Sequence, residues 1–507
     1  MQLRQLIQSL ATHEVEGTLD RAVSGLAYDS RRVQPGVVFF ALPGQFTDGH
    51  QFIDNAIDRG AVAVVCERNG FSSARATKIV VPDAREALAR VATAYYGHPS
   101  AALKVIGVTG TNGKTTVAFM VKAMLEAAGM PTGLLGTIRY EIGDRMIPAA
   151  RTTPEALEIQ QMLAQMVKAG CQSCVMEVSS HALDQRRTVG VEFDVAIFTN
   201  LTQDHLDYHG TMDGYFAAKM KLFTALQHGV KRAAAVINID DAYGTRIDNE
   251  TDVTVKLTYG LGESARLRAT SIQLLRDRTL FQAEFEGRTL DCELPLIGRH
   301  NIYNALAAIG AGLSLNIDAR VLKRALKSLP PVPGRLERVS TVESFNVFVD
   351  YAHTDDALEQ VLRTLREVTS GRLLLTFGCG GSRDTTKRAK MGAVAARLAD
   401  ITIITSDNPR RESPEAIARQ IEAGYREVRA ADGCELELDR RRAIEEILEQ
   451  AGPGDTVLIA GKGHETYQEF EDTVVPFDDR LIAREYLEAL HLRQRQRGRS
   501  QLDCLLV

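Results

Sequence analysis

The sequence predicts an α/β protein of three domains, because patterns typical of buried strands and of helices alternate along almost the whole chain. The chain has 507 residues, which is more than one hydrophobic core usually serves. Its composition, with 45% hydrophobic and 25% charged residues, is that of an ordinary globular protein. We expect a small α/β N-terminal domain, a central domain with a parallel sheet and a C-terminal Rossmann-like domain.

The N-terminal domain is expected to cover residues 1–98. Short apolar runs predict its strands, at residues 37–42, 61–65 and 78–81. A helical pattern over residues 50–59 lies between the first two runs. The segment His98-Pro99-Ser100 is typical of a linker and indicates the end of this domain.

The central domain is expected over residues 99–334, and it begins with an apolar run at 103–109. A helical pattern starts at Val117, and Gly129 followed by Pro131 would end that helix. Further buried strands are predicted at residues 173–178, 194–200 and 234–239. The proline-rich stretch 330–334 is stiff and predicts an interdomain hinge.

The C-terminal domain is expected over residues 335–493, with residues 494–507 as a tail. Its predicted strands are at 346–350, 372–377, 400–405 and 456–460, and helical patterns cover 387–398 and 440–450. Strands that alternate with helices in this order imply a parallel sheet with right-handed crossovers.

Composition excludes several classes of protein. The net charge of −5 argues against a nucleic-acid partner held on a basic face. No stretch approaches the roughly 18 uninterrupted apolar residues of a membrane span. The first residues lack the pattern of a secretory signal, and seven dispersed cysteines fit a reducing compartment. We therefore expect a cytoplasmic protein without a membrane span.

A glycine-rich loop between the strand at 103–109 and the helix from Val117 is the sharpest motif. It reads Gly110, Thr111, Asn112, Gly113, Lys114, Thr115 and Thr116. Backbone N–H groups of such a loop bind phosphate, the lysine reaches the β- and γ-phosphates, and the hydroxyl after it holds Mg²⁺. Val108 stands where the strict pattern has glycine, so an ordinary strand–turn–helix loop is the alternative. The motif favours a central P-loop, mononucleotide-binding parallel sheet.

Acidic and histidine side chains follow two later strands of the same domain. Glu177 ends the run 173–178, where an acid would stand at the ligand-binding edge of an open sheet. It is interpreted as a Mg²⁺ ligand, with a helix-capping acid as the alternative. The segment from Asp204 to His209 holds five polar or titratable groups in six residues, which suits a metal or phosphate site or else a solvated loop. Lys219 has a helical context, in which an exposed lysine is the ordinary interpretation.

These motifs together resemble the Mur ligase family, in order over roughly residues 24–480. The resemblance extends to further strings of residues, at Asn238-Ile239-Asp240-Asp241, Gly298-Arg299-His300-Asn301-Ile302-Tyr303-Asn304, Asp350-Tyr351-Ala352-His353 and Gly461-Lys462-Gly463-His464-Glu465. It implies an ATP-dependent ligase that extends the peptide of a peptidoglycan precursor. Within the family the chain most resembles the members that add meso-diaminopimelate to UDP-N-acetylmuramoyl-L-alanyl-D-glutamate.

The resemblance also implies cofactors and site residues. Two Mg²⁺ ions are expected, held by Thr115, Glu177, His205 and a carbamate formed from CO₂ on Lys219. ATP would also contact Asn301, Arg335 and Asp350, and the catalytic residues would be Lys114, Lys219, His205 and Glu177. The UDP-muramoyl dipeptide would bind at Ser30, Thr152, Thr153, Ser179, Gln185 and Arg187. Diaminopimelate would bind at Arg383, Asp407, Asn408, Pro409, Arg410, Gly461 and Glu465. The partners are then small molecules only, and we expect a monomer.

The string Asp407-Asn408-Pro409-Arg410 is the family's mark for meso-diaminopimelate. An arginine fork pairs bidentately with a carboxylate, and this amino acid carries a second carboxylate at its far end. Lysine lacks that carboxylate, so a buried Arg410 would remain unpaired beside it, and a site of this kind rejects such an analogue by roughly 10⁴ or more. The alternatives are ligases of the same family with other substrates, such as the lysine-adding and dipeptide-adding enzymes or folylpolyglutamate synthetase. A P-loop nucleotide switch without ligase chemistry is a further alternative.

The sequence departs from the family's usual pattern at Arg151, Asp355 and Ser382, and also in the uridine-site loop Gln45-Phe46-Thr47. Arg151 stands before the two threonines where asparagine is common. Asp355 follows Ala-His-Thr where proline is frequent, and Ser382 replaces an acid before Arg383. These departures affect local contacts with the substrates rather than the class of reaction.

Overall fold

The structure, a computed structural model, describes residues 1–44, 47–68, 71, 74–339, 344–430 and 432–505, with side chains up to residue 492. It divides into two compact units. The first comprises residues 1–270, 283–290 and 303–326, and the second comprises 271–282, 291–302 and 327–507. The division near residue 326 falls shortly before the proline-rich stretch 330–334, whose role as a hinge stays a prediction.

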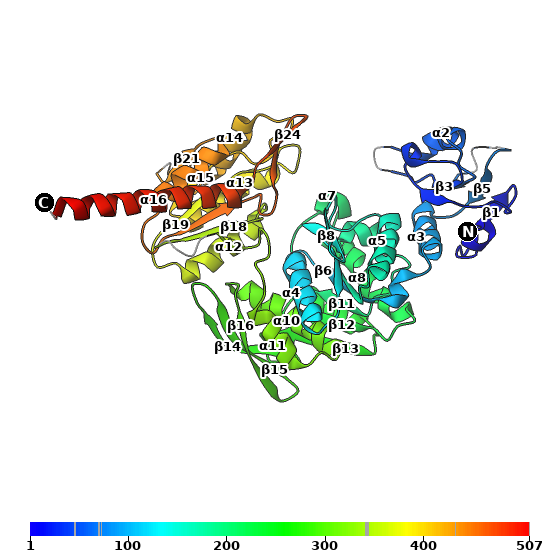
Figure 1. The fold of residues 1–507 in the computed structure, drawn as a ribbon, viewed down its shortest axis with the longest axis horizontal. Coiled ribbons are helices and arrows are strands. Elements are labelled where there is room, and N and C mark those ends of the chain that lie inside the picture. The colour runs from blue at the N-terminus through cyan, green and yellow to red at the C-terminus, as the bar shows by residue number, and fades with distance from the viewer. Residues whose placement is uncertain (45–46, 69–70, 72–73, 340–343, 431, 506–507) are drawn as a thin grey trace. The chain divides into compact units, whose positions relative to one another are not determined.

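The first sheet lies in the N-terminal part of the first unit and is coloured blue in Figure 1. Its strand order is β1 (Glu14–Glu16), β5 (Thr77–Val80), β4 (Ala63–Cys66), β3 (Val37–Phe40) and β2 (Gly25–Ala27). All pairs are parallel except β1 with β5. Alternate residues of β3 enter two separate cores, one with Val38 and Phe40 and the other with Val37 and Phe39. Both faces are therefore buried, which explains why the strand appears as a continuous apolar run. The helices of this part are α1 (Leu3–Ile7), α2 (Ile53–Asp58) and α3 (Ala84–Tyr95).

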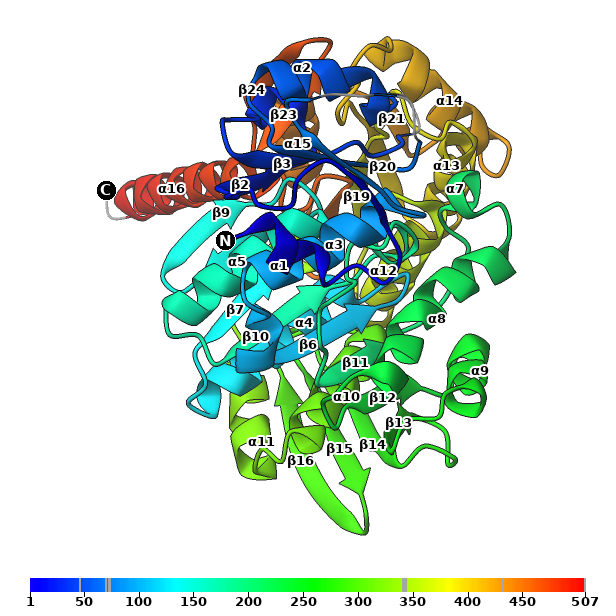
Figure 2. The ribbon, with the colours of Figure 1, turned by 90° about the vertical axis from the view of Figure 1, so that its right-hand side faces the viewer.

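The second sheet has 11 strands and carries the P-loop. Its order is β16 (Arg288–Leu294), β15 (Thr279–Phe285), β14 (Leu267–Leu274), β13 (Val255–Gly260), β12 (Ala234–Asn238), β11 (Val195–Phe198), β6 (Lys104–Thr109), β10 (Ser173–Glu177), β7 (Thr132–Leu135), β8 (Arg139–Ile142) and β9 (Arg145–Pro148). Strand β6 pairs in parallel with both β10 and β11, and Figure 2 shows these strands side by side. Parallel neighbours end at the same edge, so the loops after β6, β10 and β11 adjoin one another.

Helices connect the strands of this sheet. They are α4 (Lys114–Ala127), α5 (Ala156–Lys168), α6 (Ser180–Asp184), α7 (Leu206–His209), α8 (Met212–His228), α9 (Ala242–Glu250), α10 (Arg299–Ser314) and α11 (Ala319–Lys327). Helix α4 begins at Lys114 rather than at Val117, so the prediction of its start was wrong by nearly one turn. The cause is Gly113, whose φ of 87° turns the chain directly into the helix. Lys114, Thr115 and Thr116 therefore form the first helical turn.

The sheet of the second unit has the order β17 (Glu337–Arg338), β18 (Asn346–Asp350), β22 (Thr456–Ala460), β19 (Leu373–Phe377), β20 (Ile401–Ile404) and β21 (Cys434–Leu436). Only β17 with β18 is antiparallel. Leu373 and Leu375 of β19 enter one core and Leu374 enters another, so helices cover both faces. The helices are α12 (Asp355–Val368), α13 (Thr386–Leu398), α14 (Pro414–Arg426), α15 (Arg440–Glu449) and α16 (Asp479–Leu505). A hairpin of β23 (Tyr467–Phe470) and β24 (Thr473–Pro476) completes the unit.

The predicted α/β class with parallel sheets is confirmed, and every predicted strand is present with its ends shifted by two residues or fewer. The expected helix at 50–59 begins instead as a 3₁₀ turn, Gly49–Phe52, before α2. The linker at His98 continues into another 3₁₀ turn, Pro99–Ala102. Helix α16 runs on into the predicted tail. Among the helices of the described chain, none has the length and apolar character that a bilayer crossing requires.

Candidate functional site

The P-loop is fixed by hydrogen bonds to the loop that follows the neighbouring strand β11. The Thr199 hydroxyl donates to the carbonyl of Asn112 at 2.6 Å, and the Asn112 N–H donates to Oδ1 of Asn200 at 2.9 Å. The Thr111 hydroxyl lies 3.2 Å from the carbonyl of Thr202. These hydrogen bonds define the conformation of the loop without a ligand. The N–H groups of the first turn of α4 have no partners within the helix and can therefore bind an anion.

Two glycines of this loop have no room for a side chain. A Cβ on Gly110, whose φ is 149°, would overlap the Thr199 hydroxyl. A Cβ on Gly113 would meet Oδ1 of Asn304, a residue of α10 that sequence reasoning did not assign to the site. The quoted string 298–304 contains Asn304, but nothing in the sequence indicates that it touches the P-loop.

We expect Gly113→Ala to lower ATP affinity by roughly tenfold, because a strained residue costs about 1–3 kcal/mol and Asn304 must also move. Gly129→Ala is the matched control. Its φ of 82° is close to that of Gly113, at 87°, but a Cβ there meets nothing within 4 Å. Titration calorimetry with ATP measures the difference. Equal affinities for the two variants would contradict a binding role for the loop.

Lys114 is folded over the loop that it follows. Its Nζ donates to the carbonyl of Gly110 at 2.9 Å and to that of Thr111 at 2.7 Å. The ammonium is therefore held beside the N–H groups of the loop, where a phosphate would bring negative charge. This position supports the phosphate-binding role predicted for Lys114.

Glu177 is fully buried at the carboxyl end of β10. Its Oε2 accepts from the Thr115 hydroxyl and from the Thr137 hydroxyl, both at 2.9 Å, and its Oε1 accepts from the Thr137 N–H at 2.8 Å. The alternative of a helix-capping acid is wrong, because Ser179 caps α6 by accepting from the Ala182 N–H. The carboxylate faces the P-loop threonine instead. Thr137 is a further member of the site, and no motif in the sequence indicates it.

Lys219 is 1% exposed, so its interpretation as an ordinary exposed lysine is wrong. Its Nζ donates to the carbonyl of Gly110 at 2.8 Å and lies 4.5 Å from the centroid of the Tyr215 ring. Burial, with Lys114 nearby, holds the pKa of this amine well below its usual value. The neutral amine is the nucleophilic form.

His205 lies in the same neighbourhood. Its ring is 6.0 Å from that of Tyr215 and 4.8 Å from that of His181. Partial desolvation lowers the pKa of His205, while Asp204 opposes that shift and the side chain stays 45% exposed. Three or more His, Cys, Asp or Glu side chains poised to hold one metal ion do not occur in the part of the chain that the structure describes.

The residues predicted for the muramoyl dipeptide form one hydrogen-bonded network, apart from Ser30. Thr153 donates to the carbonyl of Glu177 at 2.8 Å and accepts from the Ser179 N–H at 3.0 Å. Arg187 donates to the carbonyl of Thr153 at 3.0 Å and to Oε1 of Gln185 at 2.5 Å. Thr152 belongs to the network because its hydroxyl accepts a hydrogen bond from the Thr137 hydroxyl at 3.1 Å. Ser30 lies elsewhere, at the start of a 3₁₀ turn (Ser30–Arg32) after β2.

The remaining nucleotide-contact predictions fall in the second unit, so each is described only within it. Asn301 is buried and donates to the carbonyl of Ile297 at 2.8 Å. Arg335 lies over the Tyr351 ring at 4.7 Å. Asp350 accepts from the N–H groups of Leu336 at 2.6 Å and Ala352 at 2.8 Å, and burial raises its pKa.

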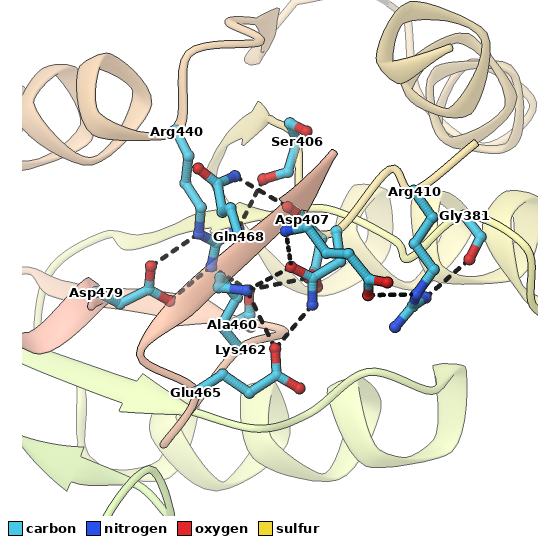
Figure 3. Close-up of polar contacts among 12 residues, drawn as sticks. Gly381, Ser406, Asp407, Arg410, Arg440, Ala460, Lys462, Glu465, Gln468 and Asp479 are labelled. Carbon is cyan, nitrogen blue, oxygen red and sulfur yellow. Dashed lines mark hydrogen bonds and ion pairs between the residues drawn. The ribbon is translucent and has the colours of Figure 1, made fainter. Parts of the chain in front are cut away.

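A buried lysine stands at the centre of the residues predicted to bind the amino acid (Figure 3). Lys462 is fully buried, and its Nζ donates to Oδ1 of Asn408 at 2.9 Å and to Oε2 of Glu465 at 3.1 Å. Asn408 also donates to Glu465 at 2.8 Å, and Asp407 lies 3.7 Å from the lysine. Asp407, Asn408 and Glu465 are thus brought together. Gly461 adjoins them, since a Cβ there would lie 2.7 Å from Oδ2 of Asp407. Lys462 belongs to the string 461–465, but the sequence predicts no role for it.

Arg410 differs from its prediction. It is half-buried rather than buried, with a side chain 22% exposed. It is not unpaired in the absence of a ligand, since Nε donates to Oε2 of Glu469 at 2.8 Å and NH1 donates to the carbonyl of Gly381 at 2.8 Å (Figure 3). Pro409 lies between Asn408 and Arg410 in the same loop. Arg383 is exposed and forms no hydrogen bond or ion pair with another described residue.

A second arginine, Arg440, contacts the backbone next to this site. Arg440 and Asp479 are both fully buried and pair through two bonds, Nε to Oδ1 at 2.8 Å and NH2 to Oδ2 at 2.7 Å. Arg440 also donates to the carbonyl of Ser406 at 3.2 Å and to that of Ala460 at 3.0 Å (Figure 3). Those two carbonyls directly precede Asp407 and Gly461. The pair therefore ties the ends of β20 and β22 to α15 and α16.

Arg151, Asp355 and Ser382, which depart from the family pattern, have local partners, whereas Gln45 and Phe46 of the fourth departure lie outside the described residues. Arg151 forms an ion pair with Glu155. Asp355 is the first residue of α12, where an acid suits the positive end of the helix. Ser382 has a φ of 53°, and its N–H donates to Glu412.

The fold and these sites match those of known proteins. Three family models match successive parts of the chain: the Mur ligase family catalytic domain at residues 22–96, the Mur ligase middle domain at 108–312 and the Mur ligase glutamate ligase domain at 334–463. The chain belongs to the Mur ligase family, and the resemblance predicted from its motifs is confirmed.

Its relatives include two curated proteins named UDP-N-acetylmuramoyl-L-alanyl-D-glutamate–2,6-diaminopimelate ligase. The protein from Syntrophomonas wolfei is 45% identical over 487 residues, which cover 96% of this chain and 99% of that protein. The protein from Geobacillus thermodenitrificans is 45% identical over 488 residues, covering 96% and 99%. A solved structure of a ligase of the same name is 33% identical, with a TM-score of 0.71, and covers 97% of this chain and all of that one.

Proposed function

We propose that the protein joins meso-diaminopimelate to UDP-N-acetylmuramoyl-L-alanyl-D-glutamate at the expense of ATP, releasing ADP and phosphate. One observation carries the proposal. Glu177 and the buried Lys219 both contact the P-loop, through Thr115 and through the carbonyl of Gly110. An acid and a buried amine beside a phosphate-binding loop suit the activation of a carboxylate by ATP. The names of the relatives support the choice of substrates.

The reaction follows from the chemistry of a carboxylate, which does not react with an amine because its oxide is a poor leaving group. An oxygen of the dipeptide's terminal carboxylate attacks the γ-phosphorus, and ADP leaves. The amine of diaminopimelate then attacks the carbon of this acyl phosphate, and phosphate departs as the amine loses a proton. Lys114 would offset the repulsion between the carboxylate and the γ-phosphate, and catalysis is mostly positioning and charge neutralisation.

The residues at the P-loop fit Mg²⁺. The Glu177 carboxylate and the Thr115 hydroxyl lie 2.9 Å apart and are hard oxygen donors of the kind that this ion prefers. Mg²⁺ keeps several waters and phosphate oxygens, so few protein ligands suffice. When bound, the ions would neutralise charge on the phosphates. Glu177 and Thr115 would hold one ion, and His205 with a carbamate on Lys219 would hold the second.

Lys219 is suited to react with CO₂. An amine attacks CO₂ only when neutral, and burial, which lowers the pKa of Lys219, favours that form. The product is a carbamate, an anion in place of a cation, and one proton is released. In the proposed role this anion helps to hold the second Mg²⁺.

Lys219→Ala should lose activity and regain part of it when a small carboxylate such as formate or acetate is added, because the acid can occupy the space of the carbamate. Phosphate release measures both effects. Lys221→Ala, two residues further along α8, is the matched control. Lys221 pairs with Asp184 at 2.7 Å and its side chain is 40% exposed, so its loss should leave activity intact. Full activity of Lys219→Ala, or no recovery with any small carboxylate, would contradict the carbamate.

Substrate contacts follow the same proposal. Arg187 is buried and pairs with Glu155 at 3.0 Å, while its Nε lacks a hydrogen-bond partner among the described residues, which supports a further acceptor there. Thr152, Thr153, Ser179 and Gln185 would complete the muramoyl-dipeptide contacts, and Ser30 would touch the uridine diphosphate. Asn301, Arg335 and Asp350 would contact ATP. We further propose a monomeric, cytoplasmic enzyme without a nucleic-acid partner.

Phosphate release tests the proposal directly. The protein is incubated with ATP, Mg²⁺ and the UDP-muramoyl dipeptide, with meso-diaminopimelate, L-lysine or no amino acid. Release with diaminopimelate alone is the expected result. Release with lysine would retain a ligase but change its substrate. The absence of release in every mixture would favour the nucleotide switch.

A further inference from the structure

The loop 407–410 is held along its length by the edge of β23. Gln468 donates from its side chain to the carbonyl of Asp407 at 2.9 Å, and the Glu469 N–H donates to Oδ1 of Asn408 at 3.0 Å. The Arg410 N–H then donates to the carbonyl of Glu469 at 3.0 Å, and the Glu471 N–H donates to the carbonyl of Arg410 at 2.7 Å. Successive residues of the strand therefore fix successive residues of the loop.

The Arg410 side chain is held from two sides. Glu469 accepts from Nε at 2.8 Å, and the carbonyl of Gly381 accepts from NH1 at 2.8 Å. The NH2 group has no partner among the described residues. Since a guanidinium is planar, two bonds to different nitrogens determine its orientation and leave NH2 open to a further acceptor.

The backbone of Arg410 is also constrained. Its φ is 52°, a left-handed conformation that a non-glycine residue adopts at a cost. The two backbone bonds to the β23–β24 hairpin hold it there. The hairpin thus fixes both the direction in which Arg410 leaves the loop and, through Glu469, the plane of its guanidinium.

We propose that Glu469 is a positioning residue that sets the selectivity for the incoming amino acid, by holding Arg410 ready for a second carboxylate. The inference rests on the proposed ligase function. Glu469 need not touch the amino acid itself. An incoming amino acid without a distal carboxylate gains no affinity from the ordered guanidinium of Arg410. An amino acid with such a carboxylate binds an arginine whose rotamers are already restricted, so less conformational entropy is lost.

The test compares Glu469→Ala, which removes the acceptor and the charge, with Glu469→Gln, which keeps an acceptor. Steady-state kinetics give KM for each substrate and kcat/KM with meso-diaminopimelate and with L-lysine. We expect Glu469→Ala to raise KM for diaminopimelate roughly ten- to hundredfold, the range for loss of a hydrogen bond to a charged group. Its kcat/KM with lysine and its KM for ATP should not change. Glu469→Gln should recover most of the loss.

Asp472→Ala is the matched control, since Asp472 is an acid at the turn of the same hairpin. It pairs at 3.5 Å with Arg411, the neighbour of Arg410, and both side chains are at least 80% exposed. Its removal should leave every KM unchanged. Three results would overturn the inference: equal effects of Glu469→Ala on kcat/KM with diaminopimelate and with lysine, equal shifts of KM in the Ala and Gln variants, or no shift of KM in either variant. If the wild type is active in the same assay, the proposed ligase function is retained. An inactive wild type would overturn both proposals.

Discussion

Lys114→Ala is expected to abolish ligase activity while leaving the fold intact. The lysine Nζ is held over the P-loop by two backbone carbonyls, where it would meet the β- and γ-phosphates. Removal of one such preorganised charge typically costs about 10²–10³ in kcat. Phosphate release with all substrates measures the loss, and far-UV circular dichroism checks the fold.

Lys122→Ala provides a matched control on the same helix. Lys122 forms ion pairs with Glu126 and Glu141, at 2.5 and 3.2 Å, and takes no part in the P-loop. This variant should keep near-normal activity, with at most a modest change in stability. Near-normal turnover of Lys114→Ala would contradict the assignment of the loop as the ATP site.

Arg440→Ala is expected to lower the free energy of unfolding by about 3–5 kcal/mol, because it leaves Asp479 as an uncompensated buried charge. Two carbonyls, those of Ser406 and Ala460, lose a donor as well. Urea denaturation followed by far-UV circular dichroism measures the change. This probe is appropriate because the chain has no tryptophan.

Arg441→Ala is the control for this prediction, since Arg441 also joins α15 to α16. It pairs with Glu485 at 3.2 Å, but both side chains are at least half exposed, so its loss should cost about 1 kcal/mol or less. Similar costs for the two variants would show that burial of the Arg440–Asp479 pair does not matter. Arg440→Met combined with Asp479→Leu should recover part of the loss, because no unpaired charge remains.

The strands that the sequence predicted are largely buried on both faces, although the buried strand β7 was not predicted. Parallel strands such as β6 and β22 are covered by helices on each side, so they appear as unbroken apolar runs. Strands β14 and β15 were not predicted. Their buried and partly buried residues alternate, and charged residues interrupt the pattern. The β23–β24 hairpin was not predicted either, because few of its residues are buried.

The candidate site was predictable wherever a residue ends a strand or directly follows one, as Glu177 ends β10 and the P-loop follows β6. The sheet alone places such residues at one edge. Contacts between distant segments were not predictable. Arg410 and Glu469 are 59 residues apart, and no local pattern connects them. The burial of Lys219 likewise depends on elements outside its own helix, such as the P-loop carbonyl that it contacts.

The register of β6, β10 and β11 limits how the chain length can vary. Glu177 lies opposite Val108, and Phe198 lies opposite Thr109. Neighbouring strands are about 4.8 Å apart, so the hydrogen-bonded backbone of the sheet sets the distance between the P-loop and Glu177. Core substitutions can change stability without changing that distance. An insertion or deletion of one residue within β10 would turn the carboxylate to the opposite face of the sheet. Length variation among functional relatives should therefore be confined to loops, above all those at the amino ends of these strands.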